Sequence, residues 1–125
     1  ATAPAFATAA TNPYGLVNVG GIARPSFVDI DGDGDFDALI GNNDGNTVVQ
    51  LNTGSASVPA FGSATTNAYG LVDVGGVARP SFVDIDGDGD LDALIGNSAG
   101  NTVVQLNTGG AVAPVNTTTA DGTYG

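Results

Sequence analysis

The chain is organised around one stretch, Phe27-Val28-Asp29-Ile30-Asp31-Gly32-Asp33-Gly34-Asp35-Phe36-Asp37-Ala38-Leu39-Ile40-Gly41-Asn42. Its five aspartates occupy alternate positions, and apolar residues flank them on both sides. Carboxylates this close together repel one another and resist compaction, so a folded chain must place positive charge between them. The chain contains only two basic residues, and one arginine cannot neutralise five carboxylates. The stretch therefore predicts a bound metal ion.

The donor atoms and their spacing indicate which metal. Zinc and copper lack their usual ligands because the chain contains no His and no Cys, whereas carboxylate oxygens suit calcium or magnesium. Counted from Asp29, carboxylates stand at positions 1, 3, 5 and 9, with a glycine at position 6 and a backbone carbonyl available at position 7. Calcium accepts more ligands in a more flexible geometry than magnesium, so we expect calcium.

The stretch begins like an EF-hand loop but departs from it in two respects. Position 12 is Ile40, where an EF-hand needs a bidentate Glu. The flanks, residues 26–28 and 38–40, are short and apolar, which is typical of strands and not of helices. The alternative interpretation is an acidic, solvated loop that binds nothing, and the regular spacing and the glycines argue against it.

The negative charge of the chain is local. All 13 acidic residues are Asp, the formal net charge is −11, and ten of the 13 lie in two loops, residues 29–37 and 84–92. Nucleic acid is excluded as an expected partner because phosphate binding needs clustered Lys and Arg. The longest apolar runs are only a few residues, so we expect no membrane span.

The composition predicts an all-β fold. The chain has 20 Gly, no Glu and no Lys, and is therefore poor in good helix formers. The absence of Cys means that no disulfide supports the fold.

The chain repeats itself with a period of 55 residues. Residues 1–55 and 56–110 are identical at 43 of 55 aligned positions. We expect two calcium-binding β repeats at 1–55 and 56–110, followed by a polar, Thr-rich tail at 111–125. A strand-rich period of this length is typical of a propeller blade or a solenoid-type array.

Each repeat is predicted to contain four or five short strands that pair antiparallel with their sequence neighbours. In the first repeat we expect them at residues 5–9, 14–19, 25–30, 37–40 and 46–52. The second repeat follows the same plan, with its last strand at 101–107.

The repeat resembles the FG-GAP/VCBS family of calcium-binding repeats, known from integrin α-subunit β-propellers and from many bacterial secreted proteins. The residues that carry the resemblance are those from Phe27 to Gly41, their copies from Phe82 to Gly96, and the segments Gly45–Gly54 and Gly100–Gly109. The resemblance covers residues 1–110. It implies propeller-blade-like sheets and an extracellular or cell-surface location.

The resemblance also implies one calcium ion per repeat, hence two in the chain. The side-chain ligands implied for the first site are Asp29, Asp31, Asp33 and Asp37, with a backbone carbonyl from Asp35. Those for the second site are Asp84, Asp86, Asp88 and Asp92, with a backbone carbonyl from Asp90.

Two repeats cannot close a propeller, which needs at least four blades. We therefore expect the repeats to belong to a longer array or a multi-chain assembly. One hypothesis is a structural module of a surface filament or adhesin stalk, whose partners are neighbouring repeats or copies of itself. The alternative is a binding module, in which further blades close a propeller that binds glycans or a protein partner. Two near-identical units without a distinctive ligand-binding loop favour the structural hypothesis.

No catalytic constellation is visible, and we expect a non-enzyme. The chain lacks His, Cys, Lys and Glu, so Ser26 and Ser81 have no histidine to activate them. Arg24 and Arg79 are expected to form ion pairs with nearby aspartates. The repeated tyrosines, Tyr14 and Tyr69, are expected to pack between repeats.

Overall fold

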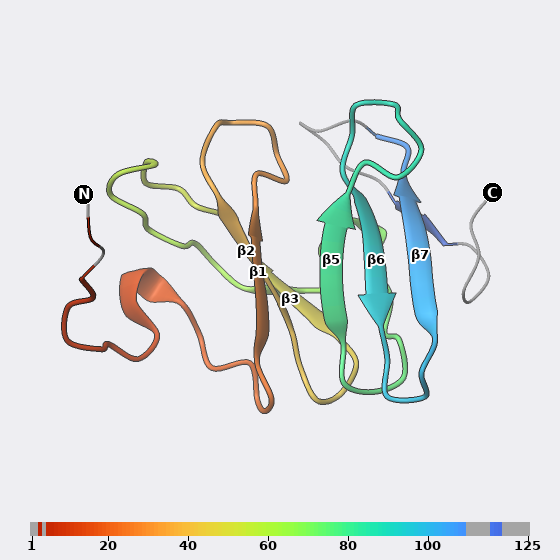
Figure 1. Cartoon of the computed structure of the whole chain (residues 1–125), viewed down its shortest axis with the longest axis horizontal. Helices are drawn as coiled ribbons and strands as arrows, with labels where there is room; N and C mark the ends of the chain where they lie inside the picture. Colours follow the sequence, from red (N-terminus) through yellow and green to blue (C-terminus); the bar gives the residue numbers. More distant parts are fainter. Residues whose placement is uncertain (1–2, 4, 110–115, 119–125) are drawn as a thin grey trace.

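The computed structural model describes residues 3, 5–109 and 116–118, the last three by their backbone alone. Its elements are β-strands and two short 3₁₀ turns (Figure 1). In chain order they are η1 (Pro13–Gly15), β1 (Arg24–Val28), β2 (Asp37–Gly41), β3 (Thr47–Gln50), β4 (Thr65–Thr66), η2 (Ala68–Gly70), β5 (Arg79–Val83), β6 (Asp92–Gly96), β7 (Thr102–Asn107) and β8 (Asn116–Thr118). Within these described residues no helix is long and apolar enough to cross a membrane.

The strands form two four-stranded antiparallel sheets, ordered β1-β2-β3-β4 and β5-β6-β7-β8. The first two strands pair with the same register in both sheets: Phe27 is opposite Ala38 in the first sheet, and Phe82 is opposite Ala93 in the second. The expected all-β fold of two tandem antiparallel repeats is therefore confirmed.

The last strand of each sheet comes from the chain that follows its repeat. β4 belongs to the second repeat but pairs with β3, and an isolated bridge joins Asn52 to Phe61. β8 pairs with β7 in the same way, with Asn107 opposite Asn116. The segment predicted as a polar tail thus contains the strand that completes the second sheet.

A tight turn joins β2 to β3. The side-chain oxygen of Asn42 accepts hydrogen bonds from the backbone N–H groups of Asp44 and Asn46, each at 3.1 Å. Gly45 adopts φ 95°, a left-handed conformation that suits glycine. An Asn that bonds the backbone two residues ahead, followed by such a glycine, closes the hairpin locally.

The main hydrophobic core lies between the two repeats. Leu39 and Val49 of the first sheet pack in one cluster with Phe82, Ile95 and Val103 of the second. The segment that precedes β5 contributes three further members, namely Leu71, Val74 and Ala78. β5 packs against β1 and β2, and Figure 1 shows β5 beside the first sheet. Each 55-residue unit is small, and units of that size bury limited surface alone, so shared burial is the main apolar stabilisation.

The predicted strands at residues 5–9 and 14–19 are wrong. Neither segment pairs with a strand, and the second begins in η1, where Asn12 and Tyr14 adopt φ 51° and 63°. The side chain of Gln50 replaces the missing strand partner: its oxygen accepts from Val17 N–H at 3.0 Å, and its nitrogen donates to Gly15 O at 2.9 Å. Because the Gln50 side chain already provides hydrogen-bond partners for these backbone groups, they do not need to pair with a neighbouring strand.

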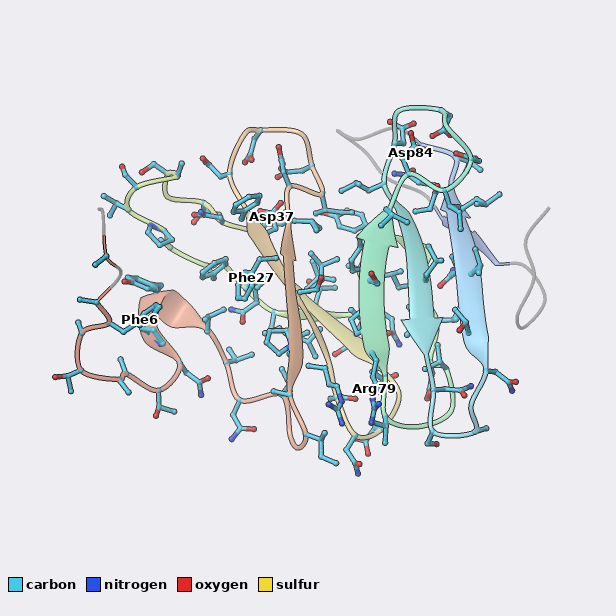
Figure 2. All side chains as sticks on the ribbon, viewed as in Figure 1. Phe6, Phe27, Asp37, Arg79 and Asp84 are labelled. Atoms are coloured by element: carbon cyan, nitrogen blue, oxygen red, sulfur yellow. The ribbon has the colours of Figure 1, made fainter. Side chains whose placement is uncertain are left out.

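The expected ion pairs of the arginines are also wrong. Arg24 and Arg79 begin β1 and β5, at the ends of the strands away from the acidic loops, and neither forms an ion pair with any described residue. Figure 2 shows Arg79 and Asp84 at opposite ends of the second sheet. The expectation for the tyrosines holds for one of them: Tyr69 packs against the core between the repeats, whereas Tyr14 is exposed.

Candidate metal centre

Each acidic loop connects the first two strands of its sheet, and both loops lie at the same end of the molecule (Figure 1). Asp37 is the first residue of β2, and Asp92 is the first residue of β6. The strand ends therefore fix the beginning and the end of each loop. The eight residues between β1 and β2 form a tight loop that brings their carboxylates close together.

The loops bring together eight of the ten predicted site residues. Each offers a carboxylate oxygen that lies within 4.8 Å of those of the other members of its cluster. The first cluster is Asp29, Asp31, Asp33 and Asp37, and the second is Asp84, Asp86, Asp88 and Asp92. The side chains of Asp35 and Asp90 lie outside these clusters. A ligand that acts through its backbone carbonyl does not need a converging side chain, so their role stays a prediction.

The carboxylate of Asp29 shapes the first loop. It accepts hydrogen bonds from the backbone N–H groups of Gly32, Asp33 and Gly34 at 2.8, 3.1 and 2.8 Å. Partial burial works against ionisation, but these hydrogen bonds, with Gly34 foremost, hold the pKa of Asp29 below its usual value. Asp84 makes the same three bonds in the second loop, and its pKa is lowered chiefly by the bond from Gly89.

Gly34 allows the loop to turn back. It adopts φ 91°, and Gly89 adopts φ 93° at the matching position. A residue with a side chain is disfavoured in this left-handed region, so the glycine at position 6 of the loop allows the turn.

Asp37 is fully buried and ties the loop to the rest of the sheet. One carboxylate oxygen accepts from Ile30 N–H at 3.0 Å, and the other accepts from Asn52 N–H at 2.8 Å, just beyond β3. Burial nevertheless raises the pKa of Asp37, and the charges of Asp33 and Asp29 raise it further. Asp92 is held in the same way, by Ile85 N–H at 2.9 Å and Asn107 N–H at 2.7 Å.

The first cluster carries unbalanced negative charge. Burial, followed by the charge of Asp37, raises the pKa of Asp31 to about 6. Burial and the charge of Asp92 likewise raise the pKa of Asp86. Two carboxylates 4.8 Å apart repel by roughly 3 to 4 kcal/mol at an effective dielectric constant of about 20. Because both arginines lie at the far ends of the sheets, no protein cation relieves this repulsion within the described residues.

These clusters fit a hard divalent cation. All converging atoms are carboxylate oxygens, which calcium and magnesium prefer, and no nitrogen or sulfur ligand is available. A divalent ion would neutralise the negative charge of the clustered aspartates, which neither arginine balances. Up to four carboxylates with added backbone carbonyls suit the flexible shell of calcium better than the strict octahedron of magnesium.

Sequence reasoning missed two contributors to the first site. One is the backbone of Asn52, which fixes Asp37 from 15 residues away. The other is Tyr69 of the second repeat, whose pKa is raised by burial and then by the charges of Asp31 and Asp37. The recurrence of Tyr at 14 and 69 was visible, but the effect of the first loop's charges on Tyr69 depends on how the repeats pack.

The site lies within the part of the chain that matches a known family. A family model described as an FG-GAP-like repeat matches residues 29–95, which is more than half of the chain and includes both acidic clusters. No curated protein and no solved structure matches the chain.

Proposed function

Because the chain belongs to the FG-GAP-like repeat family, we propose that it is a structural module in which each repeat binds one calcium ion. The observation that carries this proposal is the convergence of four carboxylate oxygens within 4.8 Å in each loop, with no basic side chain beside them in the part of the chain that the structure describes. The ligands would be the clustered aspartates, with Asp35 and Asp90 contributing carbonyl oxygens.

Calcium would act on stability. Bound ion would replace repulsion among the aspartates with attraction and hold the end of β1 against the start of β2. Since Asp37 also bonds the backbone of Asn52, the same ion would stabilise the end of β3. Binding energy then becomes folding energy, because the unfolded chain has no preformed site.

We place the module outside the cell, in a secreted or cell-surface assembly such as a filament or an adhesin stalk, in a bacterium. Extracellular calcium modules bind with dissociation constants of about 10⁻⁴ to 10⁻³ M, a range in which calcium outside cells keeps the sites filled. We assign the chain no catalytic role, because its clustered carboxylates are better used as ligands and no His, Cys, Lys or Glu accompanies them. Its partners would be neighbouring repeats or copies of itself.

A binding module is the second candidate, in which these sheets are blades of a propeller that binds glycans or a protein. An apolar hollow of about 430 Å³ beside the first loop favours it, since Tyr14, Phe27, Phe36 and Phe61 line the hollow. Aromatic rings at an open surface can stack on sugars. Saturable binding of a soluble oligosaccharide, lost in Phe36→Ala, would support this candidate.

Calorimetric titration with calcium tests the main proposal. The unaltered chain should bind two ions, Asp33→Ala or Asp88→Ala should bind one, and the double variant should bind none. Asp44→Ala is the matched control, because Asp44 is exposed outside the loop and the second repeat already carries Ala at this position, Ala99. Two ions bound by Asp33→Ala would contradict the assignment.

A further inference from the structure

The same residue is buried in one repeat and exposed in the other. Phe27 is 46% exposed, whereas its counterpart Phe82 is 8% exposed. Ala23 is exposed, whereas its counterpart Ala78 is fully buried. Because the repeats are identical at 43 of 55 positions, sequence does not cause this difference. The cause is that the second repeat has a neighbour on that side and, among the described residues, the first has none.

The contact between the repeats joins two different faces. We define the front face by its members in the second repeat, which are Tyr69, Leu71, Val74, Ala78 and Phe82. We define the back face by its members in the first repeat, which are Ile30, Leu39, Gly41, Asn42 and Thr47. Apart from half-buried Tyr69, all of these residues are buried.

Backbone hydrogen bonds and a close approach fix how the front face sits on the back face. The N–H groups of Val74, Val77 and Ala78 donate to the carbonyls of Gly45, Asn43 and Asn42 at 2.9, 3.0 and 2.9 Å. Gly41 lies against the carbonyl of Ala78 so closely that a Cβ atom there would overlap it. This contact is therefore specific in register as well as apolar.

The chain carries one further copy of each face, and each is more exposed than its docked counterpart. The remaining front face, on the first repeat, consists of Tyr14, Leu16, Val19, Ala23 and Phe27. The remaining back face, on the second repeat, consists of Ile85, Leu94, Gly96, Asn97 and Thr102. The hollow beside the first loop belongs to this front face, because Tyr14, Leu16 and Phe27 line it.

We infer that a second copy of this chain docks its front face on the back face of the second repeat, head to tail, and repeats the internal contact. This second copy would be the partner in the structural assembly proposed above, and the inference rests on that proposed function. The copy's Ala23 would lie against Gly96, where an added Cβ meets only Arg79 Cβ, at 3.9 Å. The side chain of Val83 would enter the copy's hollow, as its counterpart Val28 packs against the core between the repeats.

This docking does not require an exchanged strand. In the first sheet, Phe61 of the second repeat bridges to Asn52 at the outer edge. In the second sheet, β8 of the same chain already occupies the matching position on β7. Copies can therefore join through their faces alone. A contact between two different faces adds copies in one direction, giving a ring if the rotation closes and a filament if it does not.

Two variants block one face each. Ala23→Glu places a charged side chain on the front face, and Gly96→Ala places a methyl group where the copy's Ala23 carbonyl would lie. Both positions are outside the internal contact, so both variants should keep the circular dichroism spectrum, the melting temperature and the two calcium sites of the unaltered chain. Val83 lies two residues before Ile85 and is 45% exposed, so Val83→Glu is a second variant that would block docking on the back face.

Sedimentation velocity in calcium, at protein concentrations up to several hundred micromolar, tests the inference. The unaltered chain should form concentration-dependent oligomers, and each single variant should lose at least tenfold in association constant. An equimolar mixture of Ala23→Glu and Gly96→Ala should form dimers and nothing larger, because each variant retains the face that the other lacks. A monomeric unaltered chain, or variants whose association constants match that of the unaltered chain, would overturn the inference. Calorimetry on the same samples keeps the outcomes separate, since two bound calcium ions with no assembly would leave the proposed function intact.

Discussion

Substitution of Gly41 by Ala would test whether the repeats depend on each other for stability. A Cβ atom at this position would overlap the carbonyl of Ala78 and approach Pro80 Cδ at 2.7 Å. Both obstacles belong to the backbone or ring of the second repeat, so neither can rotate away. The variant must separate the repeats locally or strain β2.

The expected loss of stability has two parts. Overpacking of a closely packed contact costs about 1 to 3 kcal/mol. Strain on the hydrogen bond from Ala78 N–H to Asn42 O, 2.9 Å long, removes about 0.5 to 1.5 kcal/mol more. A combined loss of about 3 kcal/mol would lower the midpoint of urea unfolding by roughly 1.5 M for a small domain. Equilibrium urea unfolding in calcium, at low micromolar protein concentration, measures this shift.

Gly96→Ala is the matched control for Gly41→Ala. Gly96 has the same place in its sheet, but the nearest atom to an added Cβ is Arg79 Cβ, at 3.9 Å. Its free energy of unfolding should change by less than about 0.5 kcal/mol, or rise slightly because Ala restricts the unfolded chain. Equal losses in the two variants, or no loss in Gly41→Ala, would refute the reasoning that the repeats lock together at this point.

Two further predictions concern the acidic loops. Asp35→Ala should keep both calcium sites and change their affinity only a few-fold, because a carbonyl ligand survives truncation of its side chain; calorimetry that finds one site lost would contradict this. The second prediction concerns Asp31, whose pKa in the metal-free folded protein is raised to about 6. Between the ordinary Asp pKa and that value, the folded protein therefore binds more protons at this group than the unfolded chain does. The metal-free protein should consequently gain stability from Asp31 as the pH falls from 7 to 5. In saturating calcium the same change should lower stability, because protons compete for the ligands; urea unfolding at the two pH values, with calcium and with chelator, should show opposite trends.

The strands that flank the acidic loops were predictable from sequence because their signals are local. Residues 25–30, 37–40 and 46–52 were expected as strands, and β1, β2 and β3 lie within or overlap these ranges. Short apolar segments bounded by Pro, Gly and Asn define such strands without information from elsewhere. The segment 14–19 looks similar in composition, but its partner is Gln50, 33 positions beyond Val17, and the side chain of that residue replaces a strand. A contact this distant leaves no local pattern.

The candidate site was predictable to a comparable extent. Alternate aspartates with a glycine turn indicated which carboxylates would converge, and position 7 of the loop indicated that the Asp35 side chain would not. The buried bonds from Ile30 and Asn52 to Asp37 depend on the way that β1, β2 and β3 assemble. The different burial of Phe27 and Phe82 lies beyond any sequence pattern, because identical residues differ only in what packs against them.

Thermal unfolding with and without calcium tests the central claim most directly. With a dissociation constant on the order of 10⁻⁴ M, 10 mM calcium would stabilise the fold by about 2.7 kcal/mol per site. Two filled sites would then raise the melting temperature by roughly 20 °C relative to the protein in excess EDTA, given the usual entropy of unfolding for a chain of this size. Calcium restored after EDTA should recover the full increase, and sodium chloride at equal ionic strength should not. Equal melting temperatures in calcium and in EDTA, with the ion confirmed absent from the chelated sample, would contradict the claim that calcium holds these repeats together.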